Sequence, residues 1–309
     1  MLDTKLKTRG LLIGAGGLLG PPMRNALNQA GFNYDIFARS PLPDVNTQPF
    51  RTGASRIIKG NLNVPEEVDS AVQNCRWIVY IPTNRPSKIA HTAQVVDAAQ
   101  RHNVKVIVKV SAILAGADPP LSFGIEHRAA EKLLIHSTVP WIILRPAFFM
   151  QTFQMFAEGM QRHGRLMVPV PSGQTAFVDT QDVAKCVAAC LSRPDAYLGK
   201  TLPLTGPEAL SMAGVARRLS QASGRTIQAI APPRLVARVM MRFVERMDPW
   251  LVTRLMQMFS ALESNQEACV SPHVESILDH QATSFGEFLQ RDPVASSLWQ
   301  ADSYPRCWL

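Results

Sequence analysis

Aromatic residues are scarce in this 309-residue chain, where phenylalanine, tryptophan and tyrosine together make up 7%. No block of basic residues is interleaved with aromatics, as it is in many surfaces that stack on nucleic-acid bases. The formal net charge of +8 therefore does not predict nucleic-acid binding. No apolar run reaches the ~18 residues of a membrane span, and the N-terminus lacks the apolar core of a signal peptide. We expect a cytoplasmic protein.

The chain also lacks the patterns of a disulfide framework and of a metal site. Its cysteines form no CxxC pair and are odd in number, so we expect reduced thiols. They are Cys75, Cys186, Cys190, Cys269 and Cys307. No HExxH sequence occurs, and His127 and His136 lack ligand-like spacing on one helix face. We therefore predict no metal site.

Short apolar runs alternate with helical patterns through the first half of the chain. The runs are residues 10–13, 34–38, 56–59, 77–81, 105–110 and 141–144, and helical patterns include 87–102 and 126–137. Strands that alternate with helices predict an α/β fold with a mostly parallel, doubly wound sheet of the Rossmann type.

A glycine cluster follows the first predicted strand and precedes a helical stretch. Gly14, Gly17 and Gly20 match GxxGxxG, and Gly16 also allows a Gly-x-Gly reading. Such a turn brings bare backbone beside a pyrophosphate at a helix N-terminus, whereas the alternative is an ordinary structural turn. The predicted dinucleotide contacts in this loop are Gly14, Gly16, Gly17, Leu18, Leu19 and Gly20.

The end of the second predicted strand indicates which dinucleotide is bound. NAD sites usually carry an acidic residue there, whereas an arginine accommodates the 2′-phosphate of NADP. This strand ends in Arg39 and Ser40, which favours NADP(H). The alternative is an arginine that is merely exposed at a strand end.

Two further segments, together with the glycine loop and Arg39, carry a family resemblance. They are VPWIILRPAFFMQ at residues 139–151 and AFVDTQDVA at residues 176–184. With them the chain resembles, over roughly residues 9–292, the NmrA-like branch of the atypical short-chain dehydrogenases/reductases. That branch includes quinone, isoflavone-type and alkaloid-imine reductases, together with members that bind NADP only as sensors.

The resemblance implies further cofactor contacts at the ends of the later strands. Asn61 stands where relatives commonly place an aspartate near the adenine. The other implied contacts are Ile81, Pro82, Thr83, Val110, Pro146, Ala147 and Phe148. Ligands of open α/β sheets bind beyond the carboxyl ends of the strands, which agrees with these positions.

The Tyr-x-x-x-Lys pair of standard short-chain dehydrogenases is absent. Counting back from Pro140, His127 occupies the place of the active-site lysine in isoflavone-reductase-like relatives. A histidine there can donate a proton or a hydrogen bond to substrate near neutral pH, and the alternative is a surface histidine without a chemical role. Ser111 is the second catalytic candidate, to orient the substrate, although a hydroxyl that ends a strand is often structural.

We expect residues 1–150 to form the NADP-binding core and residues 151–309 a smaller, mainly helical substrate-binding region. Within the latter, residues 176–179 are predicted to be a strand and 182–191 a helix, so that segment 176–191 returns to the core.

An arginine repeat in the second half contributes much of the basic excess. Arg234, Arg238, Arg242 and Arg246 are spaced four apart, with apolar residues on the opposite side of the predicted helix. The simplest interpretation is a solvated helix packed on the core. A Met-rich substrate cover, a homodimer surface and adhesion to anionic lipid are the alternatives.

Together these patterns predict an NADP(H)-dependent oxidoreductase, with secondary metabolism as one setting. The substrate would be a hydrophobic carbonyl, enone, quinone or imine, because an easily reduced electrophile needs less proton assistance. A non-catalytic NADP(H)-sensing regulator and an isomerase or cyclase with a structural cofactor are the alternatives.

The substitution Arg39→Asp tests the predicted cofactor preference. It should weaken NADPH relative to NADH roughly tenfold or more, since a hydrogen bond to a charged group contributes about 1.5–3 kcal/mol. Dissociation constants for both nucleotides measure this ratio. An unchanged ratio would contradict the role of Arg39.

Overall fold

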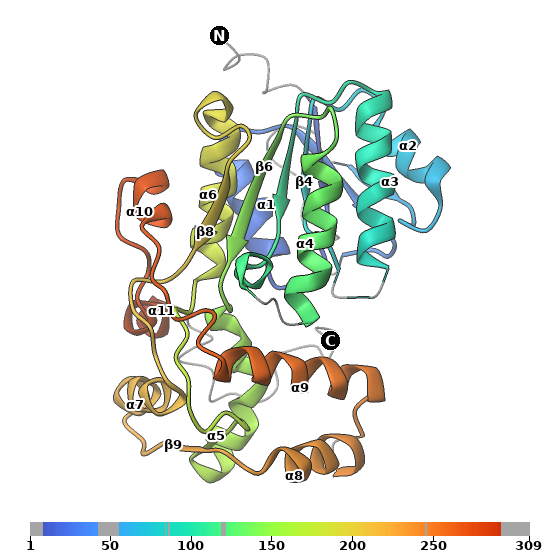
Figure 1. Cartoon of the computed structure of the whole chain (residues 1–309). Helices are drawn as coiled ribbons and strands as arrows, with labels where there is room; N and C mark the ends of the chain where they lie inside the picture. Colours follow the sequence, from blue (N-terminus) through green and yellow to red (C-terminus); the bar gives the residue numbers. More distant parts are fainter. Residues whose placement is uncertain are drawn as a thin grey trace.

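A parallel seven-stranded sheet lies at the centre of the upper layer in Figure 1. The computed structural model describes residues 9–42, 56–83, 85, 87–118, 122–244 and 246–291. Within these residues the strand order is β3-β2-β1-β4-β5-β6-β8. The strands are β1 (Gly10–Ile13), β2 (Tyr34–Ala38), β3 (Ile57–Lys59), β4 (Trp77–Tyr80), β5 (Val106–Val110), β6 (Trp141–Pro146) and β8 (Thr201–Leu204).

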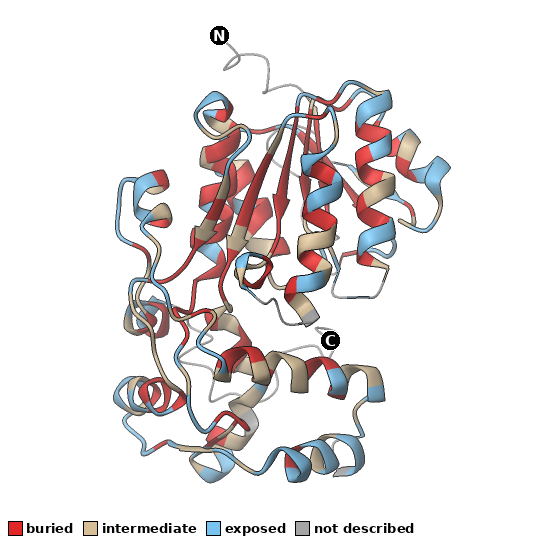
Figure 2. Cartoon of the chain, in the orientation of Figure 1, coloured by how far each residue is buried: buried red, intermediate tan, exposed pale blue. Residues whose placement is uncertain are grey.

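Helices cover both faces of this sheet, which explains why its central strands are mostly apolar. Helices α1 (Gly20–Gln29) and α6 (Thr180–Ser192) pack side by side on one face. On the other face, α3 (Lys88–Arg101) lies between α2 (Pro65–Val72) and α4 (Ser122–Ile135). Figure 2 shows the strands buried between these layers. The predicted Rossmann-type α/β fold is confirmed.

One predicted strand is wrong, and one strand of the sheet was not predicted. Residues 176–179 form no strand of the sheet and make an isolated bridge, Phe149 to Val178. Instead β8 completes the sheet beside β6. Its Pro203 argues against a strand in sequence terms, but β8 is an edge strand, where a residue without an N–H is tolerated.

The C-terminal region forms a second, smaller layer below the sheet (Figure 1). Strands β7 (Arg165–Met167) and β9 (Gln228–Ile230) pair in parallel. The helices are η3 (Met150–Phe156), α5 (Ala157–His163), α7 (Met212–Ser223), α8 (Arg234–Val239), η5 (Met240–Val244), α9 (Pro249–Glu263) and α11 (Phe285–Arg291). Helix α10 (His273–Leu278) packs on α6, and the short turns are η2 (Ile113–Gly116) and η4 (Pro194–Ala196).

None of the helices in the described part of the chain is both long and apolar enough to cross a bilayer.

Four phenylalanine rings connect the end of the described chain to this lower layer. Phe285 is fully buried, and its ring centroid lies 5.4 Å from that of Phe153 and 5.8 Å from that of Phe288. Phe177 lies 5.1 Å from Phe153 with the rings nearly edge to face. Such edge-to-face packing is favourable for aromatic pairs. Phe285 is therefore central to the second core.

Phe285→Ala should lower the free energy of unfolding by about 3–5 kcal/mol, because it leaves a cavity where rings now meet. Urea unfolding followed by circular dichroism measures the change. The matched control is Phe243→Ala, since Phe243 is 70% exposed and its loss should change stability by no more than about 0.5 kcal/mol. Equal losses in the two variants would contradict this assignment.

Candidate functional site

The glycine turn between β1 and α1 is held by close backbone packing. Gly14 has a φ of +93°, and a Cβ there would lie 2.1 Å from the Ile81 carbonyl oxygen. A Cβ at Gly20 would lie 1.9 Å from the carbonyl oxygen of Ala15. Side chains at these two positions would displace the backbone of the turn.

The other two glycines leave room for a ligand. Gly16 and Gly17 are exposed, and nothing lies within 4 Å of a Cβ built on Gly17. Pro21 and Pro22 occupy the first turn of α1 and have no N–H. We therefore expect loop amides, rather than amides of the first helical turn, to be the donors to a pyrophosphate. The open, glycine-lined turn fits a dinucleotide.

The ends of neighbouring strands meet along one edge of the sheet. Ile81 N donates to the carbonyl of Ile13, which joins the ends of β4 and β1. Ser111 N donates to the carbonyl of Leu144, and Ala147 N to that of Leu204. The structure thereby brings half of the predicted cofactor residues to this edge, namely Gly14, Ile81, Pro82, Thr83, Val110, Pro146, Ala147 and Phe148.

Phe148, just beyond β6, is held by a buried carboxylate. Its N–H donates to Glu267 Oε2 at 2.8 Å. Burial raises the pKa of Glu267 to about 7, although this hydrogen bond opposes the shift.

Val110 is 3% exposed and packs in the core, so its side chain is part of the sheet interior.

The predicted contacts to the adenosine half lie beyond β2 and β3. Arg39 and Ser40 are exposed after β2, and a Cβ built on Gly16 would lie 3.5 Å from Leu42 Cδ2. The loop after β2 therefore borders the glycine turn. Asn61 Oδ1 accepts a hydrogen bond from Asn63 N at 3.1 Å, which also gives Asn61 a role in the turn before α2.

Ser111 and His127 meet at the carboxyl edge. Ser111 follows β5, His127 lies in the second turn of α4, and each is 6% exposed. Ser111 Oγ lies 3.3 Å from His127 Nδ1, and the imidazole tautomer decides which group donates. Residues 16 apart in sequence thus form a buried polar pair.

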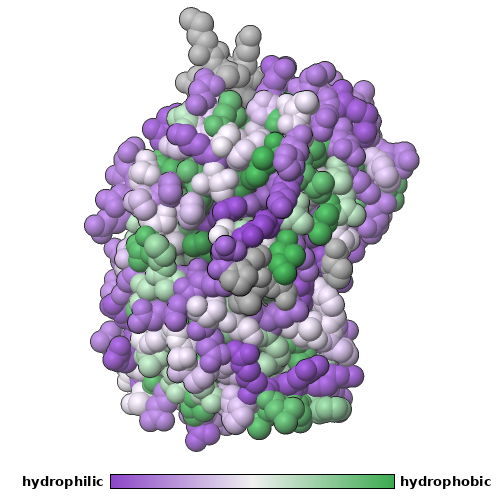
Figure 3. All heavy atoms as spheres, in the orientation of Figure 1, coloured by the Kyte–Doolittle hydropathy of each residue, from purple (hydrophilic) through white to green (hydrophobic). Residues whose placement is uncertain are grey.

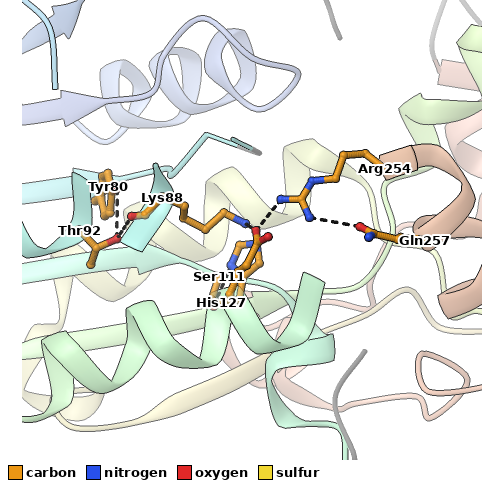
Figure 4. Close-up of polar contacts among 8 residues, drawn as sticks. Tyr80, Lys88, Thr92, Ser111, His127, Arg254 and Gln257 are labelled. Atoms are coloured by element: carbon orange, nitrogen blue, oxygen red, sulfur yellow. Dashed lines mark hydrogen bonds and ion pairs between the residues drawn. The ribbon is translucent and has the colours of Figure 1, made fainter. Parts of the chain in front are cut away.

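Glu126, the residue before His127, contributes a carboxylate that two cations share. Figure 4 shows these cations, Lys88 and Arg254, extending toward the region of Ser111 and His127. Glu126 Oε2 is 2.5 Å from a guanidinium nitrogen of Arg254 in α9 and 3.5 Å from Lys88 Nζ in α3. Lys88 is completely buried and Arg254 is 8% exposed. The Arg254 guanidinium also lies 4.6 Å from the centroid of the Phe123 ring. These contacts join the sheet layer to the C-terminal region.

The surroundings of His127 keep its imidazole neutral. Burial and the nearby charges of Lys88, Lys109 and Arg254 lower the pKa of His127 well below its usual value. Lys109 on β5 is itself fully buried, and burial lowers its pKa to about 7. The lowered pKa favours a neutral imidazole at neutral pH, and the catalytic role of His127 stays a prediction. A neutral imidazole still offers one donor and one acceptor.

Sequence reasoning missed the cations of this site. Lys109 has a detectable signal, because it interrupts the otherwise apolar run of residues 106–110. Lys88 and Arg254 have none, since each resembles an ordinary helix-surface cation until its neighbours are known. Phe123 stands four residues before His127, at the Tyr-to-Lys spacing of standard short-chain dehydrogenases, so no phenol is offered there.

Residues 14–194 match the model of the NAD(P)H-binding family, which is more than half of the chain. An NAD(P)H azoreductase of Xenophilus azovorans is 25% identical over 92% of this chain and 98% of its own. An NADPH-dependent quinone oxidoreductase of Escherichia coli, crystallised with NADPH, superposes with a TM-score of 0.81 at 20% identity, over 91% of this chain and 98% of its own.

The crystal structure of NmrA, a negative transcriptional regulator, in complex with NADP is a further neighbour. It has a TM-score of 0.77 at 14% identity and covers 97% of this chain and 98% of that one. At these identities the two crystal structures establish the shared fold, whereas the family match rests on sequence. The resemblance inferred from the glycine loop and the two later segments is confirmed. The chain belongs to the NAD(P)H-binding family.

Proposed function

We propose that the protein is an NADP(H)-dependent reductase of a hydrophobic, easily reduced carbonyl, enone, quinone or imine. The observation that carries this proposal is the Ser111–His127 pair, which lies at the same edge of the sheet as the glycine turn. Similarity to an NAD(P)H azoreductase along nearly the whole chain supports reductase chemistry. Arg39 at the end of β2 supports NADPH over NADH.

The bound cofactor would supply the hydride. The Ser111 hydroxyl would then donate a hydrogen bond to the substrate oxygen or nitrogen on which negative charge develops. His127 would support Ser111 through Nδ1, which lies 3.3 Å from the hydroxyl oxygen. The proton that balances hydride addition would come from solvent. The neutral imidazole would take it up at Nε2 while the proton on Nδ1 passes through Ser111 to the acceptor.

The nature of the acceptor follows from what surrounds this pair. Phe123 offers no acidic hydroxyl, and His127 carries no positive charge at neutral pH. Proton assistance is therefore modest, which suits an electrophile that accepts hydride readily. The partly buried Phe148 and Met256 belong to an apolar cluster of the lower layer and support a hydrophobic acceptor.

The Ser111→Ala and His127→Gln variants test the assigned roles. Each should lower kcat about a hundredfold, the size expected for loss of a positioned proton-transfer group. The Kd for NADPH should stay nearly unchanged, because neither residue belongs to the glycine turn. Steady-state kinetics and nucleotide titration measure the two quantities.

Matched controls for these variants lie outside the site. Ser276 is exposed and donates only to the His273 carbonyl, and His136 is exposed just after α4. Ser276→Ala and His136→Gln should leave kcat unchanged. Wild-type turnover in Ser111→Ala and His127→Gln would contradict the roles proposed for this pair.

NADPH oxidation with a panel of quinones, enones, imines and azo compounds tests the function itself. The expected result is stoichiometric NADPH oxidation with at least one class. Tight NADPH binding without turnover of any class would contradict the proposal and favour an NADP(H)-sensing regulator. Product formation without net NADPH oxidation would instead favour an isomerase or cyclase.

A further inference from the structure

A helical segment at the lower edge of the molecule exposes apolar side chains. It runs from Arg234 through α8 and into the π-helical turn η5. Leu235 is 73% exposed and Phe243 is 70% exposed, the highest fractions among the large hydrophobic residues that the structure describes. Val236 and Val239 are nearly half exposed. The sequence expectation that these residues face the core is wrong.

The exposed residues form one stripe with arginines at its border. At about 100° per residue, Leu235, Val236 and Val239 of α8 fall within an arc of about 100°. Phe243 follows Val239 by four residues, about one turn of the π-helical segment, and so lies on the same side. Arg238 and Arg242 project from one border of this arc and are exposed. The predicted repeat ends there, because Arg246 has a φ of +52° and lies beyond the helix.

Two of the three arginines on this segment carry charge that no ion pair neutralises within the described residues. Arg234 pairs with Glu263, but no ion pair joins Arg238 or Arg242 to a carboxylate within the described residues. Residues 209–244 contain no acidic residue at all and six arginines. An anionic partner would complement this surface.

The segment is placed where a flat surface can reach it. Figure 1 shows α8 at the end of the molecule remote from the sheet, and Figure 3 shows hydrophobic residues at that edge beside hydrophilic ones. A groove of about 340 Å³ separates the segment from α9 and is lined by residues that include Leu235, Phe243 and Val252. Exposed apolar clusters of this kind mark interaction sites.

We propose that α8 and η5 dock on an anionic phospholipid membrane. The apolar stripe would enter the interface, while Arg238 and Arg242 would reach lipid phosphates from its border. The apolar residues and the arginines lie on different sides of the helix. This arrangement matches a bilayer surface, where the hydrocarbon lies deeper than the charged headgroups. The proposal concerns a surface away from the Ser111–His127 pair and depends on neither cofactor nor turnover.

Co-sedimentation of the full chain with phosphatidylcholine vesicles, with and without phosphatidylglycerol, tests the proposal. The chain is expected to bind the vesicles that contain phosphatidylglycerol and not those of phosphatidylcholine alone. Binding should weaken as added salt screens the charge of the arginines. Leu235→Ser/Phe243→Ser and Arg238→Gln/Arg242→Gln should each reduce partitioning about tenfold or more. Unchanged circular dichroism verifies the fold of these surface variants.

The control Arg217→Gln/Arg225→Gln removes the same charge from exposed sites on and just after α7, and it should bind like the wild type. An equal loss in this control would overturn the proposal, because binding would then follow net charge alone. Absence of binding to anionic vesicles at low salt would also overturn it. Light scattering without vesicles gives a further test. A dimer that Leu235→Ser/Phe243→Ser abolishes would also overturn the proposal, because a second copy of the chain would then cover the stripe.

Discussion

The Glu126 carboxylate holds the two layers of the molecule together at the site. It accepts from Lys88 on α3 and from Arg254 on α9, which are far apart in sequence. Without this carboxylate, two buried cations would face each other without a counter-charge, and burial of unpaired charge is strongly unfavourable. The pairing therefore brings α9 across the carboxyl edge of the sheet, beside Ser111 and His127.

The same arrangement sets the chemistry that the site can support. Positive charge from Lys88, Lys109 and Arg254, added to burial, keeps His127 neutral. Phe123, beside the same cations, offers no hydroxyl. In the proposed reduction, weak assistance to protonation would suit an acceptor that takes hydride readily. Helix α9 thus contributes Arg254 to this interior while it borders the groove beneath α8 and η5.

Much of the sheet could be predicted because its signals are local. The apolar runs from β1 to β6 are short and separated by helical patterns, and the glycine turn requires residues without a Cβ at Gly14 and Gly20. Two signals misled. Residues 176–178 are apolar because they are buried near Phe149, not because they pair in the sheet. Pro203 hid β8, since its acceptability depends on an edge position that only the strand order reveals.

The order of residues along the chain established the parallel fold, the dinucleotide turn and the position of Arg39, because each depends on periodicity or on neighbours in sequence. Three-dimensional packing established the rest. It placed Ser111 against His127, collected three cations around that imidazole, and left Leu235 and Phe243 facing outward. Charge state and exposure depend on what surrounds a side chain in space, and those surroundings include segments as far apart in sequence as those of Glu126 and Arg254.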